Sequence, residues 1–156
     1  GETDLMALEW LKQRYSEVTA SLKTEVTKFK NKSFLEAVVA GCALVAHADG
    51  VVRPEEKQKM MGFLRNSDVL SVFSVEEVIV IFDKYSKQFE FDHQIGQASA
   101  LQVLAKLKGK DAEARLMVRV CCAIGAADGN FDDNEKGVVR KICAELGLNP
   151  KDFDLA

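Results

Sequence analysis

Apolar residues recur at helical spacing near the start of the chain. Between residues 5 and 29 they fall three or four positions apart, which is the period of one face of an amphipathic helix. The positions are Leu5, Leu8, Leu11, Tyr15, Val18, Leu22, Val26 and Phe29. A basic run at residues 28–32 closes the segment. We predict an N-terminal amphipathic helix over residues 1–32, followed by a helical domain over residues 33–156.

Two later stretches carry no charge on any side. Residues 37–46 contain only apolar or small side chains, and residues 120–127 repeat this feature. A helix that is apolar all round is normally a buried one. Because Gly41 and Cys42 also make the first stretch slim, we predict that the two helices pack closely at the centre of the fold.

Capping signals divide the rest of the chain into further helices. Ser33 with Glu36, and Ser74 with Glu77, have the spacing of capping boxes at helix starts. Pro54 suits the first position of another helix. No segment shows the strict alternation of a half-buried strand. The sequence therefore predicts an all-α, single-domain bundle of about seven or eight helices.

One bend occurs twice in the sequence. CALVAHADGVVRPEEK at residues 42–57 is matched by CCAIGAADGNFDDNEK at residues 121–136. Both copies fit the pattern ADG-x-[VF]-x-x-x-EK after an apolar run, so each is expected to form a helix, a tight turn and a second helix. The domain is thus predicted to contain an internal pseudo-repeat, over about residues 34–66 and 113–147.

Each copy places acidic residues on both sides of its turn. They are Asp49 and Glu56 in the first copy and Asp128 and Glu135 in the second, with Asp132 and Asp133 close behind. If the two bends are neighbours in the fold, up to four carboxylates converge, and they repel one another unless a cation neutralises them. All-oxygen sites suit hard ions such as calcium or magnesium. The expected cofactor is a divalent metal ion: calcium, magnesium or zinc.

A purely architectural interpretation of these acidic residues is equally open. An Asp before Gly commonly binds its own downstream amides, and a Glu in the first turn of a helix is an ordinary capping residue. Asp132 with Glu135 has the spacing of a capping box. The spacing excludes an EF-hand, which needs ligands at positions 1, 3 and 5 and a Glu at position 12.

The composition and the absence of certain motifs argue against several classes of function. The hydrophobic share of 47% and the charged share of 29% are those of a soluble globular protein. A net charge of −3 provides no electrostatic footprint for nucleic acid. No apolar run reaches the roughly 18 residues of a membrane span, and no glycine-rich phosphate loop is present. We predict a protein that is not an enzyme and has no organic cofactor and no nucleic-acid partner.

Cysteine and histidine do not form a recognisable site. The cysteines are Cys42, Cys121, Cys122 and Cys143, and all lie in apolar helical runs without CxxC spacing. Buried, reduced thiols are the favoured interpretation, and they fit a reducing compartment. His47 aligns with Ala126 in the second copy, so it lies outside the shared pattern and is predicted to be a packed histidine.

Three stretches resemble the bacterial tellurite-resistance TerB family. They are EEKQKMMGFL at residues 55–64, FEFDHQIG at residues 89–96 and AADGNFDDNEK at residues 126–136. The resemblance covers about residues 28–153. It implies an all-helical TerB-like bundle and a role in bacterial resistance to tellurite, phage and pore-forming colicins. It also implies partners from the same resistance system, in a membrane-linked complex that senses metal or other stress.

The resemblance also implies a metal-binding role for the acidic turns. The matching positions here are Asp49, Glu56, Asp128 and Glu135. Asp132 and Asp133 stand where the first copy has Arg53 and Pro54. The two bends are therefore not expected to bind a metal ion equally.

These observations predict a cytoplasmic, non-catalytic stress-response protein whose paired acidic turns bind a divalent metal ion or a partner protein. Contact with the inner face of the membrane is expected to be at most peripheral. Two alternatives stay open. Cys122 or Cys143 could capture or reduce tellurite, which requires an exposed thiol of lowered pKa. Residues 1–32 could instead dock on an anionic membrane surface.

Overall fold

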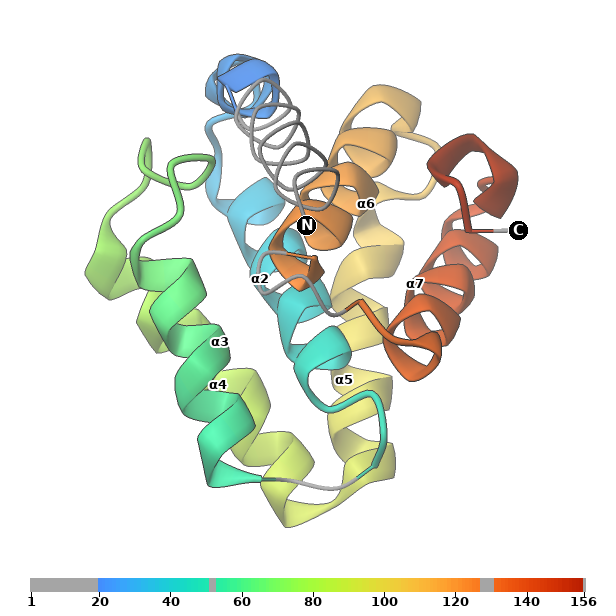
Figure 1. Ribbon diagram of the computed structural model, residues 1–156. Helices are drawn as coiled ribbons and strands as arrows, with labels where there is room; N and C mark the ends of the chain where they lie inside the picture. Colours follow the sequence, from blue (N-terminus) through green and yellow to red (C-terminus); the bar gives the residue numbers. More distant parts are fainter. Residues whose placement is uncertain (1–19, 51–52, 127–130, 156) are drawn as a thin grey trace, which may run out of the picture.

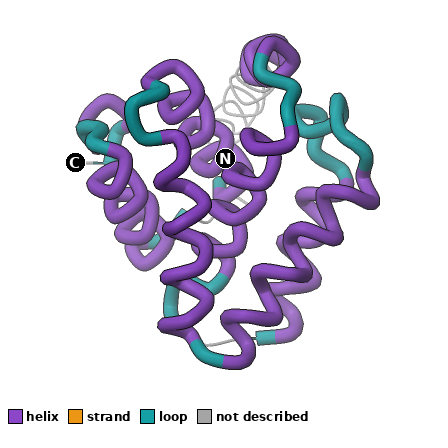
Figure 2. The backbone as a smooth tube through the Cα atoms, turned by 180° about the vertical axis from the view of Figure 1, so that it is seen from behind, coloured by secondary structure: helices purple, strands orange, loops and turns teal. Residues whose placement is uncertain are grey.

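The computed structural model describes residues 20–50, 53–126 and 131–155. All regular elements in these ranges are helical, as Figure 2 shows. After a helical stretch at residues 20–28, the elements are α2 (Lys32–Ala46), α3 (Pro54–Arg65), α4 (Val75–Phe91), α5 (His93–Leu104), the 3-10 helix η1 (Ala105–Leu107), α6 (Asp111–Gly125), α7 (Asp133–Leu146) and the 3-10 helix η2 (Pro150–Phe153). The all-α class is confirmed.

Helix α2 forms the centre of the bundle. It contacts α3, α4, α5, α6 and α7, and Figure 1 shows it between the α3–α4 pair and the α6–α7 pair. From Phe34 to Val45 every residue except Glu36 is buried. The uncharged sequence of residues 37–46 explains this position, because no charged side chain has to reach solvent from them.

Residues 120–125 of the second uncharged stretch form the end of α6, the helix that packs against α2. Val120, Cys121 and Ile124 are buried in this contact region. Gly41 allows the close approach, because a Cβ atom at this position would lie 2.6 Å from the Sγ atom of Cys121. The two slim helices are therefore neighbours, as the sequence predicts.

The start of α2 differs from the prediction. The helix begins at Lys32, and the side chain of Asn31 caps it by accepting a hydrogen bond of 2.8 Å from the backbone N of Phe34. The predicted capping box of Ser33 and Glu36 is wrong. Glu36 instead accepts a hydrogen bond of 2.6 Å from the hydroxyl group of Tyr85 in α4, so a tertiary contact takes the place of the local one.

The predicted capping residues at two other helix starts have different outcomes. Ser74 precedes α4 as predicted, but its side chain makes no capping hydrogen bond, so a capping box with Glu77 is wrong as well. The capping box of Asp132 and Glu135 is present at the start of α7. Gly147 ends α7 in the left-handed conformation, with φ of 71°.

The described end of the N-terminal segment packs on the bundle. Residues 20–28 are helical, and Leu22 and Val26 are buried. Glu25 forms an ion pair with Arg119 of α6. The predicted helical positions before residue 20 lie outside the described residues. Among the helices in the described ranges, none combines the length and the apolar character that crossing a membrane requires.

Candidate functional site

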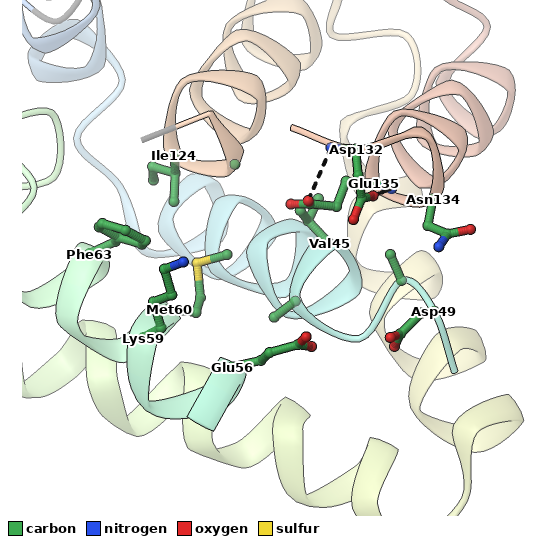
Figure 3. A pocket seen from close by; sticks show the side chains of 13 residues that line it. Val45, Asp49, Glu56, Lys59, Met60, Phe63, Ile124, Asp132, Asn134 and Glu135 are labelled. Carbon is green, nitrogen blue, oxygen red and sulfur yellow. Dashed lines mark hydrogen bonds between the residues drawn. The ribbon is translucent and has the colours of Figure 1, made fainter. Parts of the chain in front are cut away.

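A pocket of about 140 Å³ lies between described residues that flank the two bends. Helices α2 and α3 contribute residues to it from the first copy, and α6 and α7 contribute residues from the second (Figure 3). Its acidic lining residues are Asp49, Glu56, Asp132 and Glu135. The structure therefore places four of the five predicted site residues around one pocket. The fifth, Asp128, lies outside the described residues.

An arginine bridges the two carboxylates of the first copy. The Nη1 atom of Arg53 lies 3.4 Å from Oδ2 of Asp49 and 3.0 Å from Oε1 of Glu56. Helix α2 ends at Ala46, so Asp49 belongs to the turn that follows the helix. Gly50 in this turn has a φ of 77°, in the left-handed region that glycine enters without strain. Arg53 thus partly neutralises the first half of the pocket.

The carboxylates of the second copy cap helix α7. Asp132 accepts a hydrogen bond of 2.8 Å from the backbone N of Glu135, and Glu135 accepts one of 3.2 Å from the backbone N of Asp132. The second of these bonds is drawn in Figure 3. The architectural interpretation is therefore correct for this pair. A carboxylate has about four lone-pair sites, so capping leaves capacity for a further ligand.

The arrangement of the described carboxylates limits what they can coordinate. Among the residues that the structure describes, no group of three or more Cys, His, Asp or Glu side chains could hold a metal ion. In Figure 3, Asp49 and Glu56 lie on one side of the pocket, and Asp132 and Glu135 lie across from them. These four carboxylates do not form a coordination set by themselves. Asp128, the counterpart of Asp49 in the second copy, is not among the described residues.

The remainder of the pocket is partly apolar. Met60 and Ile124 line it and are buried, with 7% and 4% of their surface exposed, and Phe63 lines it with partial exposure. Lys59 also lines this part of the pocket, as Figure 3 shows. Sequence reasoning missed these residues as part of a site. For Lys59 and Met60 the available signal was their spacing, because positions three or four residues after Glu56 share its face of α3.

His47 is part of the core. It is 2% exposed, and its ring stacks on Phe89 with centroids 4.8 Å apart and an interplanar angle of 18°. Its Nε2 atom lies 3.4 Å from the hydroxyl oxygen of Ser86. Burial lowers the pKa of His47, because a charged imidazolium would lose its hydration there. The interpretation as a packed histidine is confirmed.

The four cysteines are free thiols in apolar surroundings. Cys42, Cys121 and Cys143 are buried, and Cys122 is partly buried. Burial raises the pKa of Cys122 to about 12 and the pKa of Cys143 to about 11. Thiols with such pKa values stay protonated at neutral pH, and the thiolate is the reactive form. These environments argue against capture or reduction of tellurite by either cysteine.

Comparison with known proteins identifies the family. The sequence model of the family described as tellurite resistance protein TerB matches residues 35–156. A curated relative from an Alcaligenes species, named tellurium resistance protein TerB, is 43% identical over 99 residues, which cover 64% of this chain and 81% of the relative. No solved structure matches the chain significantly. The family match extends over well more than half of the sequence, and the chain belongs to the TerB family of tellurite-resistance proteins.

Proposed function

We propose that this TerB protein is a non-catalytic stress-response protein whose paired acidic turns bind a divalent metal ion. One observation carries the proposal: carboxylates from both copies of the repeated bend line the same pocket, Asp49 and Glu56 from one copy and Asp132 and Glu135 from the other. Like charges that share a pocket repel one another, and a bound cation relieves that repulsion.

The chemistry of the lining favours a hard ion. The acidic residues offer only oxygen donors, which calcium and magnesium prefer, whereas zinc more often takes nitrogen or sulfur ligands. Arg53 and Lys59 supply positive charge beside or in the pocket, but the four acidic lining residues outnumber them. Asp128 is the residue that would add the further ligand, since it stands at the position of Asp49 in the second copy.

Calorimetric titration of the full chain with calcium, magnesium and zinc chloride tests this proposal. We expect binding of at least one ion to the wild-type protein, and binding at least ten-fold weaker after Asp49→Asn with Asp128→Asn. Glu145→Gln is the matched control, because Glu145 is exposed near the opposite end of α7. The absence of binding for all three ions, in calorimetry and in thermal stabilisation, would rule out the metal site.

A second candidate function is binding of a basic segment from a partner protein. The observation that favours it is Arg53, whose guanidinium group already lies between Asp49 and Glu56. The partner would come from the tellurite-resistance system, in a complex associated with the membrane, and we place this chain in the cytoplasm with at most peripheral membrane contact. A pull-down from the native host compares wild type with Glu56→Gln plus Asp132→Asn. Retention of the same partners after both charges are removed would contradict this candidate.

A further inference from the structure

The pocket at the paired acidic turns has two chemically different halves. The acidic half consists of Asp49, Glu56, Asp132 and Glu135. The apolar half includes Met60 and Phe63 from α3 and Ile124 from α6, and Lys59 of α3 lies beside them (Figure 3). A bare metal ion would use only the acidic half. The apolar half therefore bears on which partner the pocket fits.

The apolar side chains lie together in one part of the pocket. Met60 and Ile124 are buried, while Phe63 is partly exposed at the edge of the pocket. In Figure 3 these three side chains gather on the side of the pocket away from Asp49. The whole pocket, with both halves together, has a volume of about 140 Å³, which is close to the roughly 150 Å³ of an engineered cavity that binds benzene in another protein. The pocket as a whole therefore has room for one medium-sized group.

The acidic half already holds a basic side chain of this protein. Arg53 Nη1 lies 3.4 Å from the Asp49 carboxylate and 3.0 Å from the Glu56 carboxylate. The Arg53 side chain is 54% exposed, and exposed ion pairs of this kind contribute little to stability because water and salt screen them. A basic group from another molecule can therefore join or replace Arg53 at low cost.

We infer that the pocket binds a segment of a partner protein in which a bulky apolar side chain stands next to a lysine or arginine. The apolar side chain enters between α3 and α6, and the basic side chain reaches the carboxylates. Charge complementarity selects a basic segment over an acidic one, and the apolar half selects leucine-like over alanine-like neighbours. The inference rests on the proposed partner-binding role of the acidic turns and specifies the chemistry of that partner.

Three short peptides test the inference against the full-length chain. The probe is acetyl-Gly-Lys-Leu-Lys-Gly-amide, and the matched peptides replace Leu by Ala or both Lys by Glu. Binding is followed by NMR through the methyl resonance of Met60, which is assigned with Met60→Leu. We expect the leucine peptide to shift this resonance and to bind at least five-fold more tightly than the alanine peptide, and the glutamate peptide not to bind. Equal affinity for the leucine and alanine peptides, or no binding, would overturn the inference.

Protein variants test the two halves separately. Glu56→Gln and Phe63→Ala should each weaken binding of the leucine peptide at least three-fold. The controls are Glu145→Gln and Val80→Ala; Glu145 and Val80 are exposed, and neither lines the pocket. The peptide comparison on wild-type protein stays decisive if Phe63→Ala fails to fold.

Calcium titration of the same wild-type sample separates failure of the inference from failure of the metal proposal. Calcium binding without binding of the leucine peptide would overturn the inference and leave the metal proposal in place. If the peptide does not bind and calcium, magnesium and zinc all fail to bind, both are wrong.

Discussion

A Cβ atom at position 41 of α2 would lie 2.6 Å from the Sγ atom of Cys121 in α6. The sulfur atom is itself packed against the carbonyl oxygen of Val38 at 3.8 Å and against Sδ of Met117 at 3.7 Å. Overpacking a core costs about 1–3 kcal/mol, and alanine regains up to about 1 kcal/mol of helix propensity over glycine. We therefore predict that Gly41→Ala lowers the free energy of unfolding by roughly 1–2 kcal/mol, measured by urea denaturation.

The same substitution in a Cys121→Ala background is the control. Removing the sulfur atom creates room for the new methyl group, so the penalty of Gly41→Ala should become much smaller or vanish. An equal penalty in both backgrounds would mean that the contact between Gly41 and Cys121 does not set the distance between α2 and α6.

The hydrogen bond between Tyr85 and Glu36 predicts a pH-dependent contribution to stability. The hydroxyl group of Tyr85 donates to the Glu36 carboxylate, and this bond, helped by Lys84, lowers the pKa of Glu36. A lowered carboxyl pKa stabilises the fold above the ordinary value of about 4.3, and this contribution is lost as the pH falls through the lower pKa of the folded state.

Tyr85→Phe removes this hydrogen bond while it keeps the aromatic ring. We expect the free energy of unfolding to fall by roughly 1.5–3 kcal/mol at pH 7, since hydrogen bonds to charged groups contribute on this scale. The loss should be smaller at pH 3, where Glu36 is largely protonated in the unfolded chain. Urea denaturation of both proteins at the two pH values measures it, and the same loss at both values would contradict the assignment.

The environment of the cysteines predicts slow thiol chemistry in the folded protein. Burial raises the pKa of Cys122 and of Cys143, and Cys42 and Cys121 are buried. Labelling by Ellman reagent at pH 7 should be at least ten-fold slower in the native state than in denaturant, with Cys122 reacting first because it is partly exposed. Rapid native labelling of Cys143, together with consumption of tellurite, would instead support thiol-based capture.

Asp132 allows the capping role and the ligand role to be separated. Asparagine caps a helix about as well as aspartate, whereas alanine costs about 1 kcal/mol at a cap position. Asp132→Asn should therefore leave the thermal stability nearly unchanged and still weaken calcium binding, while Asp132→Ala should lower both. Calcium binding that survives Asp132→Asn at full strength would mean that Asp132 serves only as a cap.

Much of the fold could be predicted because the sequence contains two uncharged helical stretches, each followed by the same bend. The uncharged run at residues 37–46 identified the central helix, since burial is the main outcome for a helix without charge. The predicted start of that helix was wrong because Asn31 and Ser33 lie close together and both are residue types that cap helices. The choice between them depends on Glu36, whose partner Tyr85 lies in another helix.

The candidate site was only partly predictable for a similar reason. The duplicated bend indicated which carboxylates to compare, and Asp49 and Asp132 do line one pocket. The apolar half was missed because Phe63 and Ile124 are distant in sequence and become neighbours only when α3 and α6 pack around α2. The bridging position of Arg53 depends likewise on the path of the turn, which the pattern alone does not define.

The most direct test of the shared pocket is a double-mutant cycle for calcium binding across it. Glu56→Gln removes a charge from the first copy, Asp132→Asn removes one from the second, and both changes keep the size of the side chain. If one ion is bound by both copies, each single variant weakens binding in calorimetry, and the effect of the pair departs from the sum of the two by more than about 0.5 kcal/mol. Additive effects, or an effect from one copy alone, would contradict a single site shared by the two acidic turns.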